Sequence, residues 1–108
     1  MRSSPEQNEG PAWLRAVDEV FAALAHPARR QILLAIHLRG GSAAAGVIAS
    51  RFEHAWPTTT RHLSVLATAG LLTRRRAGKS VVYELDYARL AVLDAWRAWL
   101  KPPPAPGG

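Results

Sequence analysis

Residues Trp56–Asp86 read WPTTTRHLSVLATAGLLTRRRAGKSVVYELD, and this stretch decides the fold. A proline at its second position suits a helix start, and a helical apolar spacing follows until Gly70 ends it. Beyond Gly70 the apolar spacing changes to a period of two. This predicts a strand over residues 71–76, a tight turn at Ala77–Gly78 and a return strand over residues 80–85. The stretch therefore predicts a helix followed directly by a β-hairpin.

Helical patterns also lie on both sides of this stretch. The first spans residues 13–25, and the second begins at Pro27, behind His26 as a cap, and ends at the stop RGGS. Ser42 is expected to cap a third helix over residues 43–51, and a last helix follows the hairpin over residues 87–100. The fold class is therefore mainly α, with four helices, a β-hairpin and a helix. Its expected core residues are Ile32, Leu33, Ile36, Val47, Ile48, Leu63 and Leu66.

The 108 residues suit one domain. Residues 1–11 are rich in Ser, Pro, Gln, Asn and Gly, which predicts a disordered N-terminal arm. Residues 101–108, KPPPAPGG, cannot continue a helix and are expected to be a disordered tail. The folded domain is therefore expected over residues 12–100.

The composition restricts the class of partner. A formal net charge of +6 and a pI of about 11.1 favour a polyanion, either nucleic acid or an anionic membrane surface. The basic residues have no exposed apolar helix face beside them, which argues against membrane attachment. The chain lacks cysteine, an apolar run long enough to span a bilayer and a signal peptide, so we expect a cytoplasmic protein.

The helices over residues 43–51 and 57–69 are short and close together, which is typical of a helix-turn-helix motif. The second helix of this motif enters the DNA major groove by its N-terminal part. With Thr59, Leu63 and Leu66 inward, Thr58, Arg61, His62 and Val65 are expected on the outer face. Between Glu53 and Glu84 there is no acidic residue, so the basic hairpin also suits phosphates. The expected DNA contacts are Thr58, Arg61, His62, Arg74, Arg75, Arg76 and Lys79.

Large apolar side chains in the first and last helices exceed what a domain of this size needs inside. Such residues at the ends of a chain commonly mark an interface, although some of them also pack within the chain. Because symmetric DNA sites suit symmetric proteins, we expect a homodimer. The expected interface residues are Trp13, Val17, Val20, Phe21, Leu93, Trp96, Trp99 and Leu100.

The segments FAALAHPARRQILLAI (21–36), TTTRHLSVLATAGLL (58–72) and RRRAGKSVVYELD (74–86) resemble the ArsR/SmtB-type winged helix-turn-helix repressors. The resemblance covers about residues 15–100. It implies a homodimeric repressor whose first and last helices dimerise, whose fourth helix reads DNA and whose hairpin wing touches flanking phosphates. Thr60 stands where the family has Ser and keeps the hydroxyl, so it joins the expected DNA contacts. Trp56 stands where the family often has Gln or Ser, so no base preference is carried over.

Many members of this family sense metal ions, but the ligands for their sites are missing here. A thiolate site is excluded without cysteine, and the last helix contains Asp86 and Asp94 but neither His nor Glu. The histidines show no chelating spacing. We therefore expect a regulator without a metal or other cofactor, binding an inverted-repeat operator. The histidines considered are His26, His37, His54 and His62.

The sequence also bears on functions other than metal-independent DNA binding. A winged-helix module for protein interaction predicts acidic or apolar residues on the face of Thr58 and Arg61, where none stand. An enzyme is disfavoured because no nucleophile elbow is present and Gly40–Gly41 lacks the Lys-Ser/Thr of a phosphate loop. A repressor released by a small organic effector, bound near Trp13, Trp96 and Trp99, stays an alternative.

Overall fold

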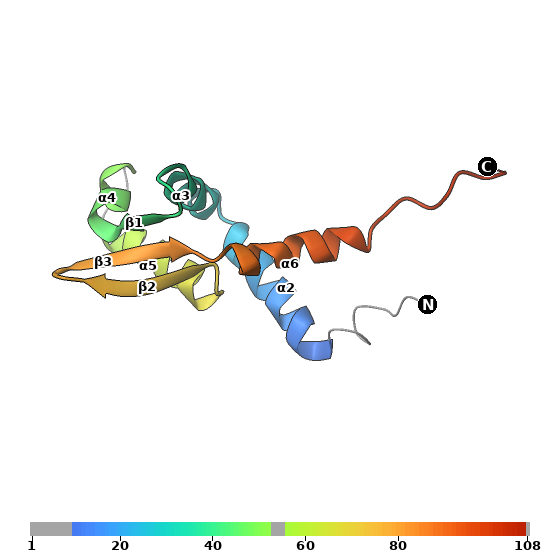
Figure 1. Ribbon diagram of the computed structural model, residues 1–108, viewed down its shortest axis with the longest axis horizontal. Coiled ribbons are helices and arrows are strands. Elements are labelled where there is room, and N and C mark those ends of the chain that lie inside the picture. The colour runs from blue at the N-terminus through green and yellow to red at the C-terminus, as the bar shows by residue number, and fades with distance from the viewer. Residues whose placement is uncertain (1–9, 53–55, 108) are drawn as a thin grey trace.

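The computed structural model describes residues 10–52 and 56–107, and its elements follow the expected order (Figure 1). The fold is confirmed as mainly helical with a β-hairpin wing, and it gains one short strand. Residues 1–9 of the expected arm, the connection at 53–55 with His54, and Gly108 lie outside the described residues. The elements are α2 (Gly10–Leu24), α3 (Pro27–Leu38), β1 (Ser42–Ala44), α4 (Ala45–Ser50), α5 (Trp56–Thr68), β2 (Leu72–Ala77), β3 (Ser80–Leu85) and α6 (Tyr87–Ala98).

The sheet has three antiparallel strands in the order β1-β3-β2. The expectation that Ser42 caps α4 is wrong, because Ser42 lies in β1 opposite Glu84. Ala44 precedes α4 instead and makes no side-chain capping bond. A strand of three residues is too short to show a period of two, and its partner is distant in the sequence. For these reasons sequence reasoning missed β1.

The hairpin turn lies one residue later than expected. Ala77 still pairs with Ser80, so the two turn residues are Gly78 and Lys79. Gly78 has a φ of +64°, a conformation that glycine adopts without steric cost. The shift places the ammonium-bearing Lys79 at the tip of the wing.

The core lies where α3, α4 and α5 pack against the sheet. The expected inward positions of α3 and α5 are confirmed, since Ile36 and Leu66 are completely buried. In α4 only Ile48 is buried, whereas Val47 is half-buried. The largest fully buried side chains, which fix the packing of α5 on the rest of the domain, are Ile32, Ile36, Ile48, Leu63, Leu66, Leu71, Leu72, Val20 and Thr59.

Capping residues set the ends of the helices around α5. Pro27 opens α3, and the His26 Nδ1 accepts a hydrogen bond from the backbone N–H of Ala28 at 3.3 Å, which confirms the expected cap. Gly70 ends α5 with a φ of +83°. This conformation favours glycine, and a Cβ at Gly70 would lie 2.9 Å from the Nε of Arg89, so a larger residue would also displace that side chain.

Asp86 links the sheet to α6 as an N-cap. Its Oδ1 accepts a hydrogen bond from the backbone N–H of Arg89 at 2.9 Å. Asp86→Ala is expected to lower the free energy of unfolding by about 1 kcal/mol, because an orphan helix donor loses its acceptor. Asp86→Asn is the matched control and should retain most of the stability, as measured by urea unfolding at one protein concentration. Equal losses in both variants would contradict a capping role.

Candidate nucleic-acid interface

Helix α5 presents a polar face at its N-terminal part. Thr58, Thr60 and Arg61 are exposed, as expected, and Thr59 faces inward with 2% of its surface exposed. None of the described acidic side chains forms an ion pair with Arg61. Hydroxyls and an unpaired guanidinium on one helical turn can donate hydrogen bonds to base edges and phosphate oxygens.

His62 does not belong to this exposed face, and the expectation that it does is wrong. It is 6% exposed, and its ring lies against that of His26 with the centroids 4.5 Å apart. Its Nδ1 accepts a hydrogen bond from the Nε of Arg29 at 3.3 Å. His62 follows Thr59 by three residues and precedes Leu66 by four, so helical spacing alone puts it on the inner face. Its polar character concealed this.

A cleft adjoins the exposed face where α5 starts next to the start of α3. It has a volume of about 410 Å³ and is lined by His26, Pro57, Thr58, Arg61 and His62. The His26 Nδ1 accepts the capping bond of α3, so the proton of the neutral ring lies on its other nitrogen, which can donate a hydrogen bond. The cleft therefore gives Arg61 polar neighbours from two helices.

The wing divides its arginines between the two faces of the sheet. Arg74 and Arg76 are exposed and pair with Tyr83 and Val81 across the hairpin. Arg75 is also exposed but stands on the opposite face of the sheet. The Nε of Arg75 lies 3.2 Å from the Oε1 of Glu84. The acid-free stretch therefore does not leave Arg75 without a carboxylate partner. Glu84 closes the acid-free stretch, and the β3 register brings it back to Arg75.

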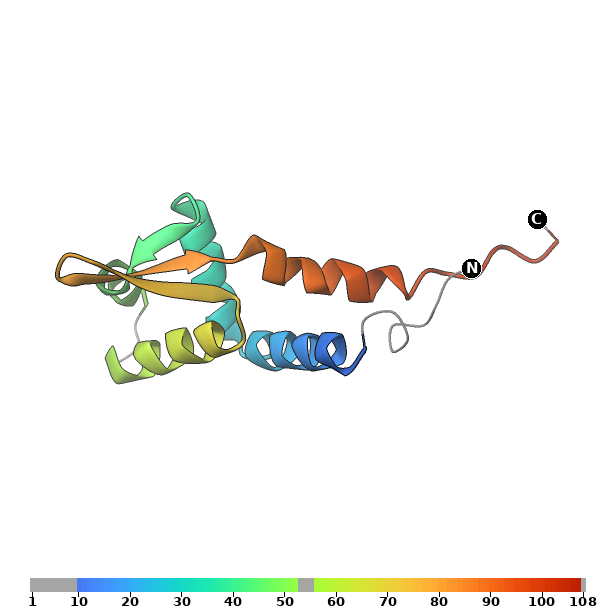
Figure 2. The ribbon, with the colours of Figure 1, turned by 60° about the horizontal axis from the view of Figure 1, so that its bottom comes forward.

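The wing tip and the start of α5 lie at the same end of the molecule (Figure 2). A groove of about 510 Å³ joins them, with Trp56 on one side and Lys79 and Ser80 on the other. Trp56 is 54% exposed. Sequence reasoning singled out Trp56 as a departure from the family but did not connect it with the wing, because that proximity depends on the tertiary fold.

The opposite end of the molecule is formed by α2 and α6 (Figures 1 and 2). Phe21 and Trp96 pack edge to face with centroids 4.8 Å apart, yet 40% and 37% of their surfaces stay exposed. None of the residues of α6 is buried. Val17 and Val20 are 5% and 0% exposed within the chain, so assigning them to an intermolecular interface is wrong.

The remaining expected interface residues, unlike Val17 and Val20, are partly or largely exposed to solvent. Trp13, Leu93 and Trp99 are half-buried, and Leu100 is 56% exposed. An amphipathic helix without a buried side requires a further surface to cover its apolar residues.

Metal ligands do not gather anywhere in residues 10–52 and 56–107. Within these ranges no group of three His, Asp or Glu side chains could hold an ion. Asp86, the N-cap of α6, accepts a hydrogen bond from the backbone N–H of Arg89 through its Oδ1. Within the same ranges, no helix has the length and apolarity to cross a bilayer.

Comparisons with known proteins agree with this geometry. Residues 24–75 match a family model described as a helix-turn-helix domain. The transcriptional repressor SdpR of Bacillus subtilis (strain 168) is 36% identical over 70 residues, which covers 65% of this chain and 76% of SdpR. The HTH-type transcriptional regulator Rv2034 of Mycobacterium tuberculosis is 38% identical over 89 residues, which covers 81% of each chain.

A solved structure also relates the chain to transcriptional regulators. It is the homodimeric winged helix-turn-helix DNA-binding domain of a possible ArsR-family transcriptional regulator from Mycobacterium bovis. It is 31% identical to this chain, covers 94% of it and 93% of its own length, and superposes with a TM-score of 0.64. These relatives are regulators of transcription and not enzymes. The chain belongs to the ArsR/SmtB family of winged helix-turn-helix transcriptional regulators.

Proposed function

We propose that the protein is a homodimeric repressor that binds an inverted-repeat operator in double-stranded DNA without a metal ion. The observation that carries the proposal is that two exposed, cationic surfaces lie at the same end of the molecule. They are the N-terminal face of α5 and the wing tip (Figure 2). The major groove accommodates one helix, and the phosphates flanking it favour a cationic hairpin. Thr58, Thr60 and Arg61 are proposed to meet the groove.

The other end of the molecule supports the dimer. Helices α2 and α6 lie away from the wing (Figure 1). They carry the exposed Phe21 and Trp96, and the exposed Leu100 follows the end of α6. A two-fold contact there leaves both α5 helices free to meet successive major grooves. The homodimeric state of the related Mycobacterium bovis domain agrees with this arrangement. A repressor of this kind acts where the chromosome lies, so we propose a cytoplasmic location.

The proposal of metal independence is supported by the side chains present in the described part of the chain. The sequence contains no cysteine, and the described part of the chain gathers no set of three metal-binding side chains. Repression is proposed to respond to protein amount or to an organic ligand.

Selection of bound fragments from sheared source-genome DNA tests the function. Purified protein is first treated with a chelator and then used at moderate salt. Recovery of an inverted-repeat site is the expected result. Salt-sensitive binding without sequence preference would contradict specific repression, and no binding at all would favour the protein-interaction module.

The wing is expected to supply affinity without base preference. Arg74→Ala or Arg76→Ala should weaken binding to all sequences alike and reduce the slope of log K against log salt by about 0.9 for each lost phosphate contact. Fluorescence anisotropy with operator and scrambled duplexes across a salt series measures both quantities. Arg97→Ala is the control, because it removes one positive charge from α6, far from the wing. An unchanged slope in both wing variants would contradict phosphate contact.

A further inference from the structure

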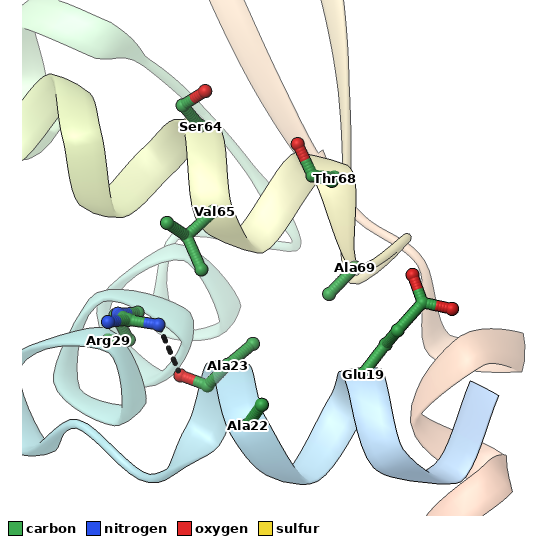
Figure 3. Close-up of a pocket in the computed structure, with 8 residues that line it drawn as sticks. All are labelled: Glu19, Ala22, Ala23, Arg29, Ser64, Val65, Thr68 and Ala69. Atoms are coloured by element: carbon green, nitrogen blue, oxygen red, sulfur yellow. Dashed lines mark hydrogen bonds between the residues drawn. The ribbon is translucent and has the colours of Figure 1, made fainter. Parts of the chain in front are cut away.

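A pocket of about 300 Å³ lies between α2 and the C-terminal half of α5 (Figure 3). Its apolar floor is formed by Ala22 and Ala23 of α2 and by Val65 and Ala69 at the end of α5. This volume is at the small end of the range for ligand sites. The pocket is distinct from the DNA-facing cleft and from the aromatic residues of α6.

Arg29 stands at one end of the pocket as a cation that no carboxylate of residues 10–52 and 56–107 neutralises. It is half-buried, its Nη1 donates to the carbonyl of Ala23 at 3.4 Å, and its Nε donates to the Nδ1 of His62 at 3.3 Å. No described Asp or Glu forms an ion pair with it. A partly desolvated guanidinium held only by neutral acceptors favours an anionic partner, and a planar carboxylate matches its fork of donors.

The rest of the lining narrows the class of ligand. Glu19 stands at the other end of the pocket from Arg29 (Figure 3), and its Oε1 lies 3.8 Å from the Nη2 of Arg89. Because the guanidinium of Arg89 is engaged in this ion pair, that end offers no unpaired cation to a second anionic group on the ligand. The hydroxyls of Ser64 and Thr68 border the same space along α5. A cationic end, an apolar floor and an ion-paired far end fit a small monocarboxylate with a short aliphatic or single-ring body.

The position of the pocket couples it to DNA binding. One wall belongs to α2, which packs on α6, and the other belongs to α5, whose N-terminal half carries Arg61. Arg29 is hydrogen-bonded to His62, the residue next to Arg61. A carboxylate that engages Arg29 competes with this bond, which joins α3 to α5, and so changes the packing of α5 against α3.

We propose that this pocket is the effector site of the repressor and that a small organic monocarboxylate bound there weakens operator binding. The inference rests on the proposed DNA-binding function. An allosteric effect of ordinary size changes operator affinity by about 5- to 150-fold.

Binding is tested first, without DNA, so that the pocket is judged separately from the repressor function. Hexanoate, benzoate and phenylacetate are titrated into full-length protein whose Ala and Val methyl groups are labelled for NMR. The corresponding amides serve as uncharged controls. At least one carboxylate is expected to shift the methyl signals of Ala22 and Val65 at millimolar concentration, and its amide is not. No shift with any of the three overturns the proposal.

Two variants locate the site. Arg29→Gln removes the charge, and Ala22→Leu fills the pocket from an exposed position while leaving Arg29 intact. Both are expected to lose the methyl shifts. If Arg29→Gln fails to fold, Ala22→Leu alone decides, and carboxylate binding that persists in a folded Ala22→Leu protein overturns the assignment.

Operator affinity with and without the bound carboxylate tests the effector role. A fall of about 5- to 150-fold in the wild type, abolished in Ala22→Leu, supports it. Carboxylate binding that leaves operator affinity unchanged overturns the effector role. A protein that binds the carboxylate but no DNA contradicts the proposed function and also removes the regulatory inference, while the ligand site itself stands.

Discussion

Trp96→Glu is expected to convert the dimer into a monomer and to weaken operator binding by about 10²- to 10⁴-fold. Trp96 is 37% exposed on a helix with no buried residue, and it packs against Phe21, which is itself 40% exposed. A dimer interface at this position would desolvate a carboxylate without a partner, which is unfavourable enough to separate the protomers. Each monomer then binds only one half-site. In the dimer, binding of one protomer holds the other protomer close to the second half-site, and this gain in affinity is lost when the protomers separate.

Sedimentation and DNA titration measure this effect together. Ala91→Glu is the matched control, because it adds the same charge to α6 at an exposed position about 140° around the helix from Trp96. It should remain dimeric. Leu100→Glu changes an exposed residue beyond the end of α6 and supplies a second test that leaves the Phe21–Trp96 contact intact. A dimeric Trp96→Glu protein with normal secondary structure would show that the interface lies elsewhere.

The sequence predicted the helices and the hairpin because their signals are local. Pro27, Gly70 and Gly78 mark a helix start, a helix end and a turn by backbone preference alone. β1 could not be predicted in this way. This strand forms because Ala43 pairs with Tyr83 of β3, a residue distant in the sequence. A segment of three residues is also too short to show the alternating pattern of a strand.

In the candidate site, too, the sequence predicted local features but not contacts between separate elements. The exposure of Arg61 follows from helical spacing, as does the inward position of Thr59. The inward position of His62 also follows from helical spacing, but its partners, the ring of His26 and the guanidinium of Arg29, are not part of α5 and depend on the tertiary fold. The Arg75–Glu84 ion pair likewise depends on strand register. Residue spacing within one element therefore predicts which side chains face inward, but it does not predict contacts between side chains of separate elements.

Arg61→Ala is expected to reduce operator affinity by about 1–3 kcal/mol at each half-site and to relax the preference at one base pair. A dimer carries two such contacts, so the total loss is about twice that figure. The reason is geometric. Arg61 is exposed on the N-terminal part of α5, which is the part of a recognition helix that reaches base edges, and its fork of donors suits the two acceptors of guanine.

Arg61→Lys separates base reading from simple attraction to phosphates. Lysine keeps the positive charge but loses the planar fork, so the salt dependence should persist while discrimination between the operator and single-base variants falls. Binding to a set of duplexes with each position substituted in turn, at two salt concentrations, measures both properties. The wing variants Arg74→Ala and Arg76→Ala serve as reference, since they should change the salt slope and leave the preference intact. If Arg61→Lys discriminates as well as the wild type, Arg61 binds a phosphate, and the bases are read by other residues of α5, with Thr58 and Thr60 the first to substitute.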